Sequence, residues 1–143
     1  MQKDKLRVIL DTNFFINYLI TNKVTKLDDL IENQTIKIIF SAELLNELIE
    51  MTKREKFKAL FNDKDLQKLL TQLRTFSSFV NVKSVISTCQ DQKANFLLAL
   101  AKDGRADYLV TNDKDLIILQ KFENTEIIAP HIFLEMFQKA ASN

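Results

Sequence analysis

The chain of 143 residues has few of the residue types on which several familiar active sites depend. It contains one glycine, Gly104, and one proline, Pro130. One glycine is too few for the nucleotide-binding loops G-x-G-x-x-G and G-x-x-x-x-G-K-[ST], and for the nucleophile motif G-x-S-x-G. The single cysteine, Cys89, excludes a disulfide within the chain and a cysteine cluster for zinc or iron. His131 is the only histidine, so a histidine-rich metal site is excluded as well.

Charge and hydropathy describe an ordinary globular protein. The net charge of +1 gives no argument for nucleic acid, and 46% of the residues are hydrophobic. No apolar run reaches the roughly 18 residues that a membrane helix needs. The first residues, MQKDKLRV, are not followed by the apolar core of a signal peptide. We therefore expect a cytoplasmic protein, and the absence of linkers and repeats predicts a single domain over residues 1–143.

Short apolar runs alternate with helical patterns along the whole chain. The runs at residues 6–10, 36–40, 79–82, 108–111 and 126–128 predict strands. Helices are expected over residues 12–20, 27–32, 41–57, from 63 or 65 to 76, 91–102, 115–121 and from 130 onward, with Ser41 as an N-cap and Gly104 as a left-handed C-cap. Because the strands are continuous apolar runs, they predict a parallel sheet with helices on both faces, which is an α/β fold.

Acidic residues stand where these strands end or where the neighbouring helices begin. Asp11 directly follows the first strand, and Asp113 follows the strand at 108–111. Glu47 lies in the second turn of the helix after the strand at 36–40, and Asp91 opens the helix before the strand at 108–111. Ligands of open parallel sheets bind outside the carboxyl ends of the strands. One edge of the sheet could therefore gather all four acids.

Gathered carboxylates need something that balances their charge. Two like charges 4 Å apart repel by about 4 kcal/mol at an effective dielectric constant near 20. Such a cluster keeps a proton or holds a cation, and carboxylates with waters suit Mg²⁺ or Mn²⁺, which activate water for hydrolysis. The simpler alternative is that Asp11, Asp91 and Asp113 are helix caps and Glu47 is solvated. The spacing leaves both interpretations open.

Four segments in order, RVILDTNFFINYL, SAELLNELIEM, DYLVTNDKDL and IIAPHIFLEMF, resemble the PIN-domain family, in particular its bacterial toxins of toxin–antitoxin pairs. The resemblance runs from Arg7 to Phe137, and LDTN and the T-x-D-x-D-L run at residues 111–116 are its most specific parts. It implies a three-layer α/β/α sandwich and Mg²⁺- or Mn²⁺-dependent cleavage of single-stranded RNA that leaves a 5′-phosphate and a 3′-hydroxyl. It also implies a small antitoxin protein that blocks the cleft, and a homodimer.

The resemblance assigns roles to individual residues of the candidate site. Asp11 resembles the first metal ligand of the family, and Glu47 and Asp113 resemble two further acids. Asn13 resembles a polar residue that supports the site, and Thr111 and Asp115 are neighbours with polar or structural roles.

One segment departs from the family. CQDQKANFLLALA resembles the pattern C-R-D-P-K-D-N-F-L-L-A-L-A, in which the second acid is often a metal ligand. Asp91 matches the first acid, but the second falls on Ala94. Asp91 lies three residues earlier, which predicts the same helix face. We therefore expect Asp91 to join Asp11, Glu47 and Asp113 as metal ligands and catalytic residues. The alternative is a weakened module that binds RNA or protein without cutting.

Two further hypotheses concern the surroundings of this site. The run KREKFK supplies candidate contacts to the RNA backbone, although a solvated helix face is the simpler interpretation. Its cations are Lys53, Arg54, Lys56 and Lys58. A phosphatase with Asp11 as nucleophile is a third reading, but such enzymes usually carry a second Asp at the place of Asn13.

Overall fold

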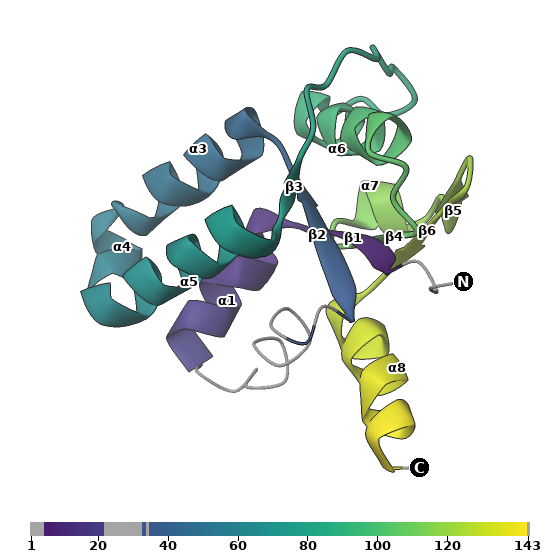
Figure 1. Cartoon of the computed structure of the whole chain (residues 1–143). Coiled ribbons are helices and arrows are strands. Elements are labelled where there is room, and N and C mark those ends of the chain that lie inside the picture. Colours follow the sequence, from purple (N-terminus) through teal and green to yellow (C-terminus); the bar gives the residue numbers. More distant parts are fainter. Residues whose placement is uncertain (1–4, 22–32, 34, 143) are drawn as a thin grey trace.

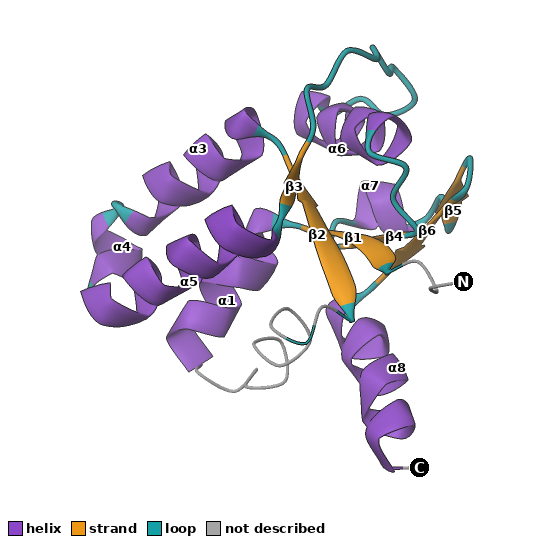
Figure 2. Cartoon of the chain, viewed as in Figure 1, coloured by secondary structure: helices purple, strands orange, loops and turns teal. Residues whose placement is uncertain are grey.

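A computed structural model describes residues 5–21, 33 and 35–142. Within these residues six strands form one sheet in the order β3-β2-β1-β4-β6-β5 (Figure 2). Only β5 runs antiparallel to its neighbour, so the predicted parallel sheet is a mixed, mostly parallel one. The strands are β1 (Leu6–Leu10), β2 (Ile36–Phe40), β3 (Ser78–Phe79), β4 (Tyr108–Val110), β5 (Lys121–Phe122) and β6 (Thr125–Ile128).

Helices cover both faces of this sheet, which confirms the predicted three-layer arrangement. Figure 1 shows α1, α3, α4 and α5 gathered on one side of the sheet and α6 on the other. The helix expected at residues 27–32 lies outside the described residues. The helices are α1 (Thr12–Thr21), α3 (Ala42–Thr52), α4 (Glu55–Lys58), α5 (Asp63–Phe76), α6 (Gln92–Asp103), α7 (Lys114–Ile117) and α8 (Pro130–Ser142). No helix of the described ranges is long and apolar enough to cross a membrane.

The centre of the core is the pair β1 and β2, whose apolar runs are buried on both faces. The ring centroid of Phe15 in α1 lies 5.6 Å from that of Phe40 in β2. Phe14 in α1 meets Phe133 in α8 edge-on at 6.4 Å. These contacts fix α1 on the sheet and thereby fix the β1–α1 junction, where Asp11 lies.

Three expected elements differ from the structure. The helix expected over residues 41–57 is interrupted, since the Thr52 hydroxyl donates to the Ile49 carbonyl and Arg54 is extended. The strand expected at 79–82 pairs only over Ser78–Phe79. The helix expected over 115–121 ends at Ile117, because the chain then turns back as the β5–β6 hairpin.

Gly104 ends α6 but not in the left-handed conformation that was expected. Its φ is −88°, and the next residue, Arg105, takes the left-handed conformation with φ 51°. A Cβ at Gly104 would lie 2.6 Å from Cγ2 of Ile39 and 2.9 Å from the Leu100 carbonyl oxygen. The glycine is therefore required because the end of α6 lies directly against β2.

Candidate active site

Asp11 lies where the strand order of the sheet reverses. The chain proceeds from β1 to β2 and β3 on one side, and then returns on the other side of β1 as β4. Asp11 directly follows β1, and its backbone N–H donates to the carbonyl of Val110 in β4 at 3.1 Å. Ligands of α/β sheets bind at such switch points, outside the carboxyl ends of the strands. Asp11 therefore lies at the carboxyl end of β1, and its role at this site stays a prediction.

The Asp11 carboxylate is buried and held by hydroxyl groups. It is 6% exposed. The Thr111 hydroxyl donates to Oδ2 of Asp11 at 2.9 Å, and the Thr12 hydroxyl approaches Oδ1 at 3.3 Å. The Thr111 oxygen also accepts from the backbone N–H of Asp113 at 3.0 Å. These bonds compensate the burial of a charged group and fix its orientation.

Glu47 reaches the same place from a different element. The Ser41 side chain accepts from the backbone N–H of Leu44 at 3.1 Å, which begins α3 as predicted and puts Glu47 in its second turn. Nζ of Lys93, in the first turn of α6, lies 2.8 Å from Oε1 of Glu47 and 3.8 Å from Oδ1 of Asp11. Two of the four expected acids thus converge on one ammonium group.

Lys93 was not among the residues expected at the site. It also donates to the Thr12 hydroxyl at 3.4 Å. Burial acts to lower the pKa of Lys93, but the hydrogen bond to Glu47 and the charges of Asp11, Glu47 and Asp91 outweigh it, so the pKa is raised. Lys93 is therefore charged at neutral pH. Its sequence signal is weak, namely a cation two residues after a helix cap at an acidic sheet edge.

Asp91 and Asp113 lie at helix starts and act as caps. Oδ1 of Asp91 accepts from the backbone N–H of Lys93 at 3.3 Å, and Oδ1 of Asp113 accepts from that of Asp115 at 2.9 Å. Burial, and then the charges of Asp115, Asp113 and Asp91, raise the pKa of the Cys89 thiol. The capping interpretation therefore describes these two acids, whereas the Asp11 carboxylate is bound by threonine hydroxyls.

Asp91 and Ala94, three residues apart at the start of α6, differ in exposure. Asp91 has extended backbone angles and is exposed, whereas Ala94 is fully buried in the core. Asp91 affects the site through its charge on Lys93 and through the start of α6.

The remaining predicted residues surround this centre at greater exposure. Asn13 is exposed in the first turn of α1, and Asp115 is exposed in α7. Lys56 lies over the ring of Phe57, with Nζ 4.9 Å from the centroid. Figure 1 shows α4 at the end of the helical layer away from α6 and β4. The four cations of this region, Lys53, Arg54, Lys56 and Lys58, are all exposed.

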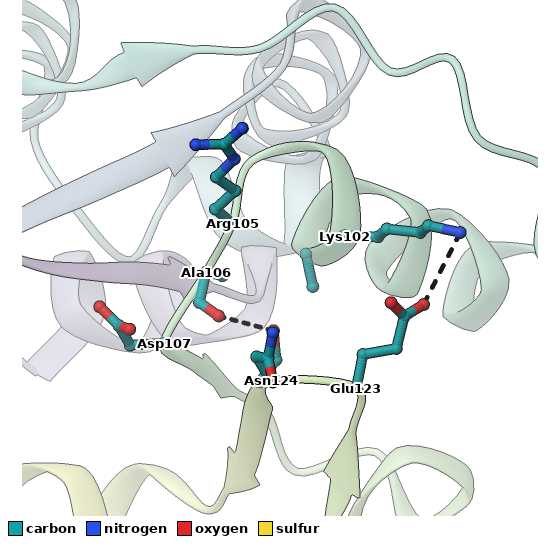
Figure 3. A pocket seen from close by; sticks show the side chains of 8 residues that line it. Lys102, Arg105, Ala106, Asp107, Glu123 and Asn124 are labelled. Atoms are coloured by element: carbon teal, nitrogen blue, oxygen red, sulfur yellow. Dashed lines mark hydrogen bonds and ion pairs between the residues drawn. The ribbon is translucent and has the colours of Figure 1, made fainter.

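Two cavities distinguish the two edges of the sheet. One of about 350 Å³ lies between α3 and α6 and is lined by Leu44, Phe96, Glu47 and Lys93, among others. The other, of about 330 Å³, is shown in Figure 3 and lies at the amino ends of β4 and β6. There Lys102 and Glu123 point toward each other, 3.8 Å apart. Only the first cavity adjoins the strand ends at which ligands of such sheets bind.

The donor set fits a divalent cation in a limited way. Within the described ranges, no group of three or more His, Cys, Asp or Glu side chains is arranged to hold a metal ion. The carboxylates of Asp11 and Glu47 nevertheless both lie close to one position, which the ammonium group of Lys93 occupies. Mg²⁺ is commonly bound by one or two carboxylates together with waters and substrate phosphates. The pair fits a Mg²⁺ of this type; the geometry does not assemble all four expected acids around one point.

Comparison with known proteins decides the family. A family model described as the PIN domain matches residues 7–115. The chain belongs to the PIN-domain family. An uncharacterized protein of Methanocaldococcus jannaschii is 31% identical over an alignment of 153 positions, which covers 99% of this chain and 98% of that protein. PIN domains are nuclease-type proteins that generally bind divalent metals. The expected family and fold class are thus confirmed, and the phosphatase reading receives no support.

Proposed function

We propose that this PIN domain is a metal-dependent endoribonuclease that cleaves single-stranded RNA. The observation that supports it most directly is the convergence of Asp11 and Glu47, from β1 and α3, on one cationic point at the strand switch. A pair of carboxylates at such a position suits a hard divalent cation that also binds a substrate phosphate.

In this proposal Asp11 and Glu47 hold Mg²⁺ or Mn²⁺. When bound, the metal supplies an activated water and stabilises the charge that develops on the phosphodiester. Thr111 orients the Asp11 carboxylate through the bond at 2.9 Å. The caps engage Oδ1 of Asp91 and of Asp113. We assign the Oδ2 atoms of these two acids to the metal or to its waters.

The remaining polar residues receive supporting roles. We propose that Asn13 and Asp115, both exposed beside the strand ends, contact the waters or the RNA. The cations Lys53, Arg54, Lys56 and Lys58 follow Glu47 along α3 and into α4. Lys53 is six residues beyond Glu47, or about 9 Å along a helix. The RNA backbone would leave the site in this direction.

The test is cleavage of single-stranded RNA with Mg²⁺ or Mn²⁺, with EDTA as the metal-free arm. We expect cutting that EDTA stops and that Asp11→Asn abolishes, because the substitution removes the charge from a buried position. Glu126→Gln, an exposed acid in β6, is the matched control and should cut like the wild type. Equal cutting by Asp11→Asn, prepared identically, would refute the assignment.

The absence of an acid at residue 94 favours a second candidate, a PIN domain that binds RNA or protein without cutting. Residue 94 is an alanine, so it supplies no carboxylate, and its side chain is fully buried. This candidate predicts binding of a labelled RNA in fluorescence anisotropy without metal-dependent cleavage. Ala94→Asp would then create cleavage if the site lacks only this acid. Continued inactivity of the folded variant would refute that explanation.

We also propose that the protein is a cytoplasmic toxin whose small antitoxin covers the site, and that it forms a homodimer. The family resemblance supports these assignments. Co-purification of the protein with the product of a neighbouring small gene, together with loss of RNA cleavage in that complex, tests the first. Light scattering at several concentrations tests the second, and a constant monomer mass would contradict it.

A further inference from the structure

We propose that Lys93 is the resident cation of the site and that a divalent metal must displace it. This inference rests on the proposed function. In the metal-free protein the Lys93 ammonium neutralises part of the charge of Asp11 and Glu47 and holds the two side chains together. Lys93 therefore weakens the binding of metal and determines the metal concentration at which the protein becomes active.

The contacts of Lys93 place it between the two acids. Nζ lies 2.8 Å from Glu47 and 3.8 Å from Asp11, and it donates to the Thr12 hydroxyl at 3.4 Å. The exposed fractions of the side chains are 39% for Lys93 and 34% for Glu47, but only 8% for Asp11. Charges that are partly buried are screened less by solvent and salt than surface charges. The ammonium is therefore an effective competitor for the same oxygens.

The position of Lys93 is set by the fold. Asp91 caps α6 by accepting the backbone N–H of Lys93, and Gly104 fixes the other end of the same helix against Ile39. The stem of Lys93 therefore starts from a fixed point beside α3. An ion pair that needs little side-chain ordering is more stable than a pair between two mobile surface residues.

The charge of the cluster shows why this matters for metal. Asp11 and Glu47 supply two negative charges, and Lys93 offsets one of them. The charge of Asp91 also acts on Lys93, and it is the same whether or not the ammonium is present. A divalent cation is attracted to one excess negative charge less strongly than to two, and it also loses oxygens that Lys93 engages. Removal of the ammonium, without any change to the carboxylates, should therefore increase metal affinity.

The experiment is Mn²⁺ titration of the full chain by calorimetry, without RNA, for four proteins. We expect Lys93→Gln to bind Mn²⁺ at least about tenfold more tightly than the wild type, because it removes the ammonium and keeps a polar side chain. Lys93→Arg keeps the charge and should bind like the wild type. Lys102→Gln is the matched control, since Lys102 lies on the same helix and pairs with Glu123 at 3.8 Å, but at the opposite edge of the sheet.

A second measurement covers the case in which a variant is less stable. The rise in melting temperature on addition of Mn²⁺ reports binding to the folded state, and it should be larger for Lys93→Gln than for the wild type and for Lys102→Gln. Equal or weaker Mn²⁺ binding by Lys93→Gln would overturn the inference. A nuclease with unchanged metal affinity in Lys93→Gln would refute only this inference, whereas tighter binding without any cleavage would refute only the proposed activity.

Discussion

Substitution of Thr111 by valine would remove the support of Asp11 while keeping the shape of the core. Thr111 is 1% exposed. Its hydroxyl donates to Asp11 at 2.9 Å and accepts from the backbone N–H of Asp113 at 3.0 Å. Hydrogen bonds to charged groups contribute about 1.5–3 kcal/mol, and a buried partner left unsatisfied costs about 1–3 kcal/mol. We therefore expect Thr111→Val to lower the free energy of unfolding by about 2–4 kcal/mol.

The matched control is Thr125→Val, which makes the same substitution at the opposite edge of the sheet. Thr125 is 3% exposed, and its hydroxyl donates to the carbonyl of Ala106 at 2.6 Å. Both partners are neutral, so the expected loss is about 1 kcal/mol. Urea unfolding followed by circular dichroism measures both values. A slope of roughly 2 kcal/mol per molar would convert a difference of about 2 kcal/mol into a midpoint shift of about 1 M.

The two variants should also differ in function. Residues that orient a metal ligand typically change metal affinity or activity by about 10–100-fold when they are removed. Thr111→Val should therefore lose Mn²⁺ affinity and RNA cleavage, and Thr125→Val should lose neither. If Thr111→Val is as stable as Thr125→Val, the hydrogen bonds to Asp11 and Asp113 contribute less than the geometry indicates. If both variants bind metal and cut equally, Thr111 does not position Asp11 for either process.

Two further predictions concern the C-terminal end of α6. Gly104→Ala should lower the free energy of unfolding by about 1–3 kcal/mol, because the new Cβ would meet Ile39 at 2.6 Å. Urea unfolding measures this loss, and an unchanged midpoint would contradict the close approach. The Asp103 carboxylate accepts a hydrogen bond from the Ser84 hydroxyl, and further bonds from the backbone N–H groups of Ser84 at 2.8 Å and Lys83 at 2.6 Å. These bonds lower the pKa of Asp103 below the ordinary 3.8. Its contribution to stability is therefore complete above pH 3.8 and lost as the pH falls through the lower folded pKa. The Ser84 amide should lose its protection from hydrogen exchange in that acidic range, and in the variant Asp103→Asn it should lose it at neutral pH as well. Equal protection of the Ser84 amide in Asp103→Asn and the wild type would refute the stabilising role of the Asp103 carboxylate.

The best-predicted elements are those whose sequence pattern has one physical cause. β1 and β2 have the expected bounds, because each ends in three consecutive apolar residues, 8–10 and 38–40, which can be buried only when both faces of the strand are covered. Ser41 caps α3 as expected, because its side chain satisfies a backbone N–H that the helix leaves free. β5 was not expected, because it has two residues, Lys121–Phe122, and no apolar periodicity. The turn that forms it places Glu123 at φ 52°, where a glycine or asparagine would have signalled a hairpin.

Gly104 shows the limit of interpreting a residue type alone. A glycine after a helix predicts a left-handed cap, since glycine adopts positive φ without strain. The same residue is also required where a Cβ would collide with a neighbour, and the sequence does not distinguish the two causes. Here the collision with Ile39 decides, and Arg105 adopts the positive φ of 51°. The reason for this glycine is therefore visible only in the tertiary contact between α6 and β2.

For the candidate site, the convergence of Asp11 and Glu47 could be predicted, but the lysine that balances their charge could not. The topology of a parallel sheet is enough to bring Asp11 and Glu47 to one edge, because both follow neighbouring strands. Their repulsion requires a proton or a cation, and a metal was the cation expected. A lysine of α6 also satisfies this requirement, and in the structure Lys93 does so. The absence of an acid at residue 94 would then affect the charge of the site as well as its number of ligands. In the proposed metal site Lys93 offsets one of the two carboxylate charges of Asp11 and Glu47, and Ala94 adds none. Both residues would therefore weaken the binding of a divalent metal, compared with a PIN domain that has an acid at residue 94.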